Sequence, residues 1–178
     1  MNTLIIYYSF TRNNELLAKQ IQQRTGGQVY KIETLRRRTK FSIFLDLVFK
    51  RKPAIRKHQL SLQTYDQIVF IAPVWAGKIA GPLVTFLNEE KNNIRQYSFI
   101  TLCGGGIGQK EKIEQELRSI FSFPPVNVTE LWISNLLSDD KKKSVNNVSG
   151  YRIQSEDWVK YKEKLDEFCN VIQGELVK

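Results

Sequence analysis

The sequence predicts an α/β protein of three layers, in which a five-stranded parallel sheet is covered by helices on both faces. Short apolar runs alternate along the chain with longer stretches whose apolar residues recur at helical spacing. The short runs are apolar throughout, which is typical of strands buried on both faces, as in parallel sheets. The chain has 178 residues, of which 42% are hydrophobic, so it is long enough for one domain with a sizeable core.

The first apolar run starts at Leu4 and leads into a helix with Leu17 and Ile21 on one face. Two consecutive glycines, Gly26 and Gly27, end that helix. The other strands are expected at residues 29–33, 68–72, 99–103 and 126–133.

The later helices have recognisable limits. Pro82 suits the first position of a helix, because its missing N–H would have no partner there. A further helix ends before Pro124 and Pro125, and Ser155 is expected to cap the last one. The polar stretch 138–149 is predicted to be a mobile loop.

The net charge of +9 is concentrated in residues 36–57, the basic segment. It holds nine Lys or Arg and a single acid, Asp46, a net charge of +8. Within it, residues 41–49 have helical character, since Phe41, Phe44, Leu45 and Val48 recur at helical spacing. Two interpretations stay open: an extra helix that packs on the domain with solvated charged ends, or an interfacial helix that docks on an anionic lipid surface or an acidic protein.

Other features exclude several classes of protein. The two cysteines, Cys103 and Cys169, have no paired spacing, which argues against a zinc site or a disulfide scaffold. The N-terminus has no charged region before its apolar run and no run reaches the length of a membrane span, so we expect a cytoplasmic protein. His58, the single histidine, is expected to be solvated. No recognised motif accompanies the basic charge, so nucleic-acid binding is not expected.

Three polar or glycine-rich loops follow the first, third and fourth predicted strands, whose carboxyl ends lie at one edge of the sheet. The first loop leads into a helix whose first N–H groups have no intrahelical partner, and this favours a phosphate site. Alternatively, its hydroxyl and amide side chains only cap the helix. The second loop presents Trp75, and the third has three consecutive glycines that let a planar ligand approach the main chain. Together they indicate a mononucleotide with a flat head group.

The first loop lacks the G-x-x-x-x-G-K-[ST] pattern of ATP- and GTP-hydrolysing proteins, and Gln109 stands where a dinucleotide fingerprint needs its third glycine. Instead, Ser9-Phe-Thr-Arg-Asn-Asn resembles the phosphate loop of the flavodoxins, [ST]-x-T-G-N-T. Pro73-Val-Trp-Ala-Gly resembles the family's second flavin loop, and Cys103-Gly-Gly-Gly resembles its third. The motifs occur in the family's order, and the similarity covers most of the chain. The resemblance implies a doubly wound sheet of order 2-1-3-4-5 that binds FMN non-covalently.

Under this resemblance, all three loops would contact the flavin. The phosphate would be held by Ser9, Thr11, Asn13 and Asn14. Trp75 would stack on the isoalloxazine, although a core aromatic role is the alternative. The main chain around Gly104 and Gly105 would face the pyrimidine edge. The full set of expected cofactor-binding residues is Ser9, Phe10, Thr11, Arg12, Asn13, Asn14, Pro73, Val74, Trp75, Ala76, Gly77, Cys103, Gly104, Gly105 and Gly106.

The first loop departs from the family pattern at two positions. Arg12 replaces the glycine and Asn14 replaces the last threonine. If the Arg12 position needs a positive φ, a residue other than glycine costs about 1 kcal/mol there. Arg12 would either add a charge-assisted contact to the phosphate or narrow the loop. We expect binding to be retained, because main-chain donors survive the substitution.

The implied function is that of an FMN-dependent redox protein: an electron carrier, or an NAD(P)H-linked flavin or quinone reductase, with NAD(P)H or a redox protein as partner. Carriers of the family are typically acidic, so the basic charge disfavours a plain carrier or implies an acidic partner. The alternative is a flavin-free module of this fold that binds an acidic protein or a membrane surface through the basic segment. No paired carboxylates, Ser/His/Asp set or metal-ligand cluster appear, so no catalytic side chain is assigned.

Overall fold

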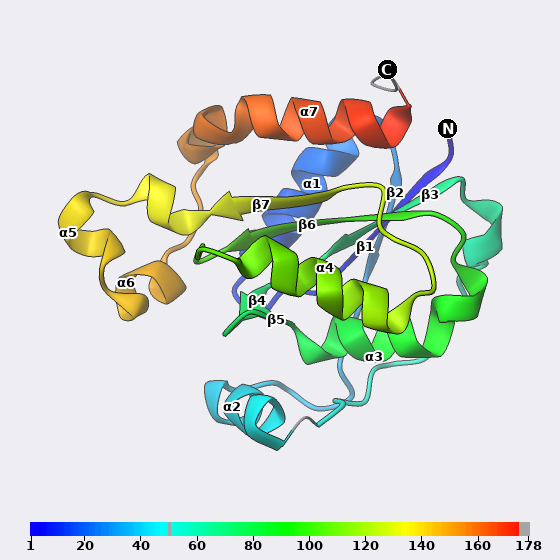
Figure 1. The fold of residues 1–178 in the computed structure, drawn as a ribbon, viewed down its shortest axis with the longest axis horizontal. Coiled ribbons are helices and arrows are strands. Elements are labelled where there is room, and N and C mark those ends of the chain that lie inside the picture. Colours follow the sequence, from blue (N-terminus) through cyan, green and yellow to red (C-terminus); the bar gives the residue numbers. More distant parts are fainter. Residues whose placement is uncertain (50, 175–178) are drawn as a thin grey trace.

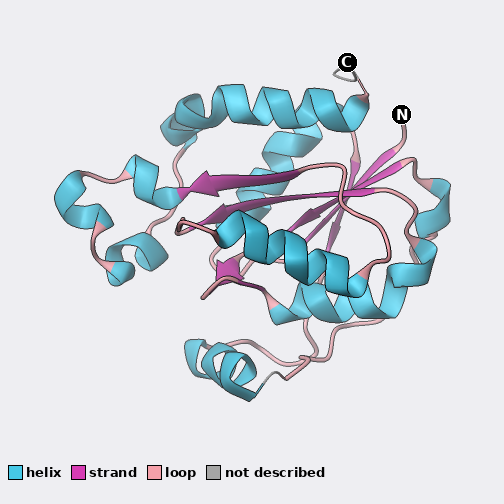
Figure 2. Cartoon of the chain, in the orientation of Figure 1, coloured by secondary structure: helices cyan, strands magenta, loops and turns pink. Residues whose placement is uncertain are grey.

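The computed structural model describes residues 1–49 and 51–174, and Lys50 of the basic segment lies outside them. Its centre is a five-stranded sheet of order β2-β1-β3-β6-β7, in which every pairing is parallel (Figures 1 and 2). This confirms the predicted fold class and strand order, with β6 and β7 as the fourth and fifth predicted strands. In chain order, the strands are β1 (Thr3–Tyr7), β2 (Gln28–Lys31), β3 (Gln67–Ile71), β6 (Tyr97–Cys103) and β7 (Val128–Trp132).

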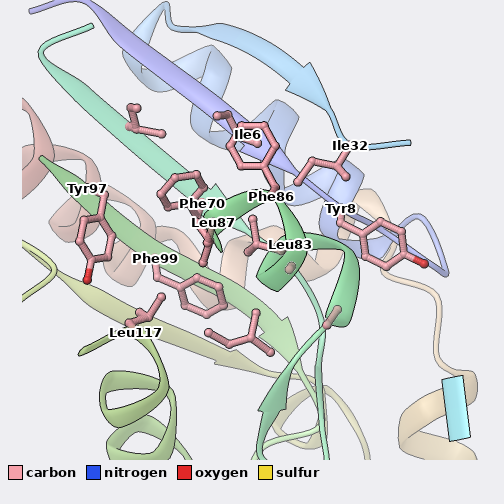
Figure 3. Close-up of a cluster of buried hydrophobic side chains, with 14 of the residues drawn as sticks. Ile6, Tyr8, Ile32, Phe70, Leu83, Phe86, Leu87, Tyr97, Phe99 and Leu117 are labelled. Carbon is pink, nitrogen blue, oxygen red and sulfur yellow. The ribbon is translucent and has the colours of Figure 1, made fainter. Parts of the chain in front are cut away.

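Helices cover both faces of the sheet, because successive residues of each strand point to opposite sides. From β1, Ile5 and Tyr7 pack in the core under α1 (Asn13–Thr25) and α7 (Lys162–Gln173). Leu4 and Ile6 pack in the opposite core, under α3 (Gly81–Glu90) and α4 (Gln109–Ile120). Figure 3 shows this second core, in which aromatic side chains from β3, α3 and β6 meet. None of the helices in the described part of the chain is long and apolar enough to span a bilayer.

Several local predictions need correction. A hairpin of β4 (Val74–Trp75) and β5 (Lys78–Ile79) follows β3, and sequence patterning missed it because each strand has only two residues. The stretch predicted as a loop forms two short helices, α5 (Asp139–Lys142) and α6 (Val145–Gly150). The last helical segment begins as a 3-10 turn, η4 (Ser155–Tyr161). It is capped through a reciprocal bond pair of Gln154 and Asp157, and the predicted cap Ser155 lies inside the turn.

The basic segment contains the predicted helix, α2 (Lys40–Phe49), at the periphery of the molecule beyond α3 (Figure 1). Of the α2 residues, Ile43 is the one that is buried, and Phe41 and Phe44 are exposed. The predicted stripe is therefore not the face that packs. The expectation that His58 is solvated is wrong: its side chain is 8% exposed and stacks near Phe86, with ring centroids 4.8 Å apart. The basic residues around His58 in the sequence suggested an exposed side chain, but Tyr30 and Phe86, which contact its ring, are distant in the sequence.

Candidate functional site

The carboxyl ends of β1, β3 and β6 surround a cavity of about 420 Å³. It is lined by ten of the fifteen residues expected at the cofactor: Thr11, Asn13, Asn14, Pro73, Val74, Trp75, Ala76, Cys103, Gly104 and Gly105. The other five, Ser9, Phe10, Arg12, Gly77 and Gly106, belong to the same loops but are not part of this lining. Three segments that are far apart in the sequence thus form one site, as expected from the parallel strands.

The first loop ends in a residue with left-handed backbone. Arg12, immediately before α1, has φ 70° and ψ −13°, and its side chain is exposed. The position therefore does require a positive φ, and an arginine occupies it. The next three N–H groups form the first turn of α1, where no helical carbonyl can reach them, so they are available to an anion.

The side chains of Asn13 and Asn14 are engaged by protein main chain. Asn14 Nδ2 donates to the carbonyl of Leu102 over 3.0 Å, and its Oδ1 accepts from the Leu102 N–H over 2.9 Å. Asn13 makes the same kind of pair, donating to the Tyr151 carbonyl and accepting from the Ile153 N–H. Both residues are buried. We therefore assign their main-chain N–H groups, rather than their side-chain amides, as the donors they offer to an anion.

Trp75 lies at the tip region of the β4–β5 hairpin, where Ala76 (φ 50°) and Gly77 (φ 73°) form the turn. Its ring packs edge-on against Tyr8 and Phe10, with centroids 6.4 and 6.2 Å away. The side chain is only partly buried and lines the 420 Å³ cavity. Phe10 thus supports Trp75 from outside the cavity. Trp75 also packs against the core beneath α3 and α4, so its ring is partly a core aromatic and partly available to a ligand.

The glycine loop after β6 is shaped by its neighbours. A Cβ on Gly105 would lie 2.6 Å from the Trp132 ring, and the residue has φ 88°. A Cβ on Gly104 would lie 3.2 Å from Val148. Gly106, in contrast, has open space around it. Packing therefore requires glycine at position 105, whereas a side chain at position 104 would need Val148 to shift by a few tenths of an ångström.

Cys103, the last residue of β6, is buried; its thiol lies 3.8 Å from a carboxylate oxygen of Glu130 on β7, and Gln109 donates to its sulfur over 3.1 Å. Burial, followed by the nearby Glu130 charge, raises the pKa of the Cys103 thiol to about 12. The thiolate is therefore scarce at neutral pH, which disfavours a nucleophilic role for this residue.

Sequence reasoning missed a fourth wall. The cavity is also lined by Lys142 of α5, by Lys143 directly after it, and by Val145, Val148 and Ser149 of α6. Ile133 and Ser134 complete this side. One signal was available: the stretch follows β7, whose carboxyl end lies at the same sheet edge as the other three loops. Its lysines bring positive charge to the cavity.

Solved structures share the fold of this chain. A flavoprotein from Lactobacillus acidophilus NCFM, in complex with FMN, is 20% identical, with 72% of this chain and 92% of that chain covered and a TM-score of 0.64. The flavodoxin of Streptococcus pneumonia TIGR4 covers 99% of this chain and 100% of its own, at 11% identity and a TM-score of 0.56. The fold is that of the flavodoxins. Oxidised flavodoxin 1 from Bacillus cereus is similar over 99% of this chain and 100% of its own, at 13% identity and a TM-score of 0.51. The sequence matches no protein-family model and no curated protein.

Proposed function

We propose that this flavodoxin-like protein binds FMN in the 420 Å³ cavity and acts as a redox protein. The observation that carries the proposal is the meeting of three loops around one cavity, with a helix N-terminus on one wall and a partly exposed tryptophan on another. The volume falls within the range of small-molecule sites, roughly 300–1,000 Å³.

The residues present fit the phosphate of FMN. The first turn of α1 supplies main-chain N–H groups and the positive end of the helix dipole. Thr11 adds a hydroxyl at the cavity wall. Ser9 Oγ is buried and has no hydrogen-bond partner within the described chain, an arrangement that a phosphate oxygen would satisfy. Lys142 and Lys143 would add favourable charge.

The residues also fit a flat ring. Trp75 offers an aromatic surface and Gly104 and Gly105 offer accessible main chain, while Val145 and Val148 supply apolar contacts. The flavin, when bound, would supply the electron transfer. The chain would bind and orient the flavin, and Lys142 and Lys143 would make the electrostatic potential around it more positive. The partner is a redox protein or NAD(P)H. A basic chain favours an acidic partner over the role of a simple acidic carrier.

An absorbance spectrum of the purified protein, before and after incubation with FMN and removal of the excess, tests the proposal. We expect a retained flavin band that bleaches with dithionite. Trp75→Leu should weaken FMN binding by at least about tenfold if the ring stacks on the flavin. Trp158→Leu, outside the cavity, is the matched control. Absence of a retained flavin in the wild type would leave the flavin-free module as the function to pursue. NAD(P)H oxidation by the loaded protein then separates reductase from carrier.

A further inference from the structure

The α2 helix turns an apolar face to solvent. Phe41, Phe44, Val48 and Phe49, here called the α2 face, are 68%, 57%, 55% and 62% exposed. Exposing this much aromatic and aliphatic surface on ten residues has a free-energy cost, at about 25 cal/mol per Å² of apolar area. Scattered exposed apolar residues are ordinary, but a contiguous face marks an interaction site.

The opposite side of α2 faces the domain. Ile43 is buried, and Asp46 pairs with Arg38, whose side chain is 13% exposed. At the base of the segment, Leu35 donates to the Ala54 carbonyl over 3.1 Å and Arg56 donates to the Glu33 carbonyl over 2.8 Å. A cavity of about 360 Å³ separates part of α2 from the β4–β5 hairpin, α3 and α4. The segment is thus anchored at its base, with Ile43 turned toward the domain and the α2 face outward.

Positive charge lies at both ends of the α2 face. Arg36, Arg37 and Lys40 are exposed before or at the start of the helix, and Arg51 and Lys52 are exposed after it. The one acid of the segment, Asp46, is turned inward and neutralised by Arg38. Arg51 also contacts the Phe49 ring, 5.3 Å from its centroid. An apolar face between cationic ends is the pattern of a helix that lies in a membrane interface.

We propose that the α2 face docks on an anionic lipid surface. A bilayer accepts protruding aromatic side chains at its interface without a shaped partner pocket, and its negative surface attracts the arginines and lysines at about 1 kcal/mol each. A second copy of the chain would bring two strongly basic segments together, which like-charge repulsion opposes. An acidic protein would account for the charge, but it would need a groove for the convex row of phenylalanines.

Docking in this orientation leaves α2 between the bound surface and the candidate redox site. Trp75 lines both the cavity behind α2 and the 420 Å³ cavity. A surface bound by the outward α2 face would therefore have the helix and the 360 Å³ cavity between it and Trp75, so docking alone does not bring that surface to the candidate redox site. The docking itself does not depend on flavin binding.

Flotation of the whole chain with lipid vesicles tests the proposal. The vesicles contain either phosphatidylcholine alone or phosphatidylcholine with about 30% phosphatidylglycerol, at about 0.1 M salt. We expect flotation with the anionic vesicles and not with the neutral ones. Phe41→Ser with Phe44→Ser should weaken binding at least about tenfold, and Arg36→Gln with Arg37→Gln should do the same.

Matched controls use exposed residues on the other side of the molecule. Val159→Ser, at a 77% exposed valine, and Lys160→Gln with Lys164→Gln should bind like the wild type. Denaturant unfolding confirms that each variant is folded. Equal binding to both vesicle types, or to neither, overturns the proposal. Full binding by the phenylalanine variant together with displacement by polyglutamate would mean that the surface recognises charge alone, as on an acidic protein. A dimer that this variant dissociates would instead identify a second copy as the occupant.

Discussion

The side-chain amide of Asn14 closes a two-bond ring with the main chain of Leu102, although the two residues are 88 positions apart. This ties the N-terminus of α1 to the carboxyl end of β6, so the proposed phosphate loop and the glycine loop are held at a constant separation. Both bonds are buried. Asn14 stands where the flavodoxin pattern has a threonine, and its amide length is what allows it to reach both groups.

Asn14→Ala should therefore lower the free energy of unfolding by about 2–3 kcal/mol, because it leaves the N–H and carbonyl of Leu102 buried without partners. Urea unfolding followed by circular dichroism measures the change. Asn92→Ala, at an exposed asparagine after α3, is the control and should change stability by less than about 0.5 kcal/mol. Equal effects of the two substitutions on stability would contradict a role for Asn14 in holding α1 and β6 together.

Neighbouring glycines of the third loop should respond differently to the same substitution. Gly105→Ala places a methyl group against Trp132 and forces a positive φ on alanine, so we expect a loss of about 2 kcal/mol or more. Gly106→Ala meets open space and should cost less than about 0.5 kcal/mol. Thermal unfolding of both variants checks this, and the tryptophan fluorescence should shift only in the first, because its methyl group contacts Trp132. A harmless Gly105→Ala would show that Trp132 can move aside freely.

Two substitutions at Arg12 separate the effect of backbone strain from the effect of charge. Arg12→Gly removes the cost of a positive φ and should stabilise the protein by up to about 1 kcal/mol. Arg12→Gln removes the charge but keeps the Cβ, so it should leave stability unchanged. If main-chain N–H groups hold the phosphate, both variants should bind FMN within about threefold of the wild type by flavin fluorescence titration. Weak binding by both would instead assign the phosphate contact to the arginine charge.

Stability should depend on pH through Glu116 of α4. Burial raises the pKa of its carboxyl above the ordinary value of 4.5, while the Ile79 N–H bond and the Lys78 charge oppose the rise. The folded state then holds the proton more tightly than the unfolded state, so stability from this group is present below pH 4.5 and is lost as the pH rises through the folded pKa.

Glu116→Gln keeps an acceptor for Ile79 and removes the titration. Its Tm should exceed that of the wild type at pH 7 and match it at pH 4. Glu167→Gln, at an exposed glutamate on α7, is the control and should change neither value. A Glu116→Gln protein that is less stable than the wild type at pH 7 would mean that the attraction of the carboxylate to the Lys78 charge outweighs the cost of burying it.

Local patterns in the sequence were enough for the strands of the sheet and for the edge at which their loops meet, and the strand order followed from the resemblance to the flavodoxins. Continuous apolar runs such as Ile68–Ile71 predict strands that are buried on both faces. Parallel strands place the loops that follow them at one edge of the sheet. Three of the cavity walls could therefore be predicted from the order of the loops. The positive φ at Arg12 was also foreseeable from the glycine it replaces. Such features depend on residues close together in the chain.

Only the tertiary structure decided which partners the polar side chains choose and which apolar face of α2 is covered. Asn13 and Asn14 are of a residue type that binds phosphate or caps helices, yet their side-chain amides form hydrogen bonds with segments more than 80 residues away. Lys142 and Lys143 look like part of a solvated loop, yet they line the cavity. In α2, Ile43 is buried against the domain, and the regularly spaced Phe41, Phe44 and Val48 are exposed to solvent. Hydrogen bonding and burial across the fold are set by geometry between distant segments, which local periodicity does not record.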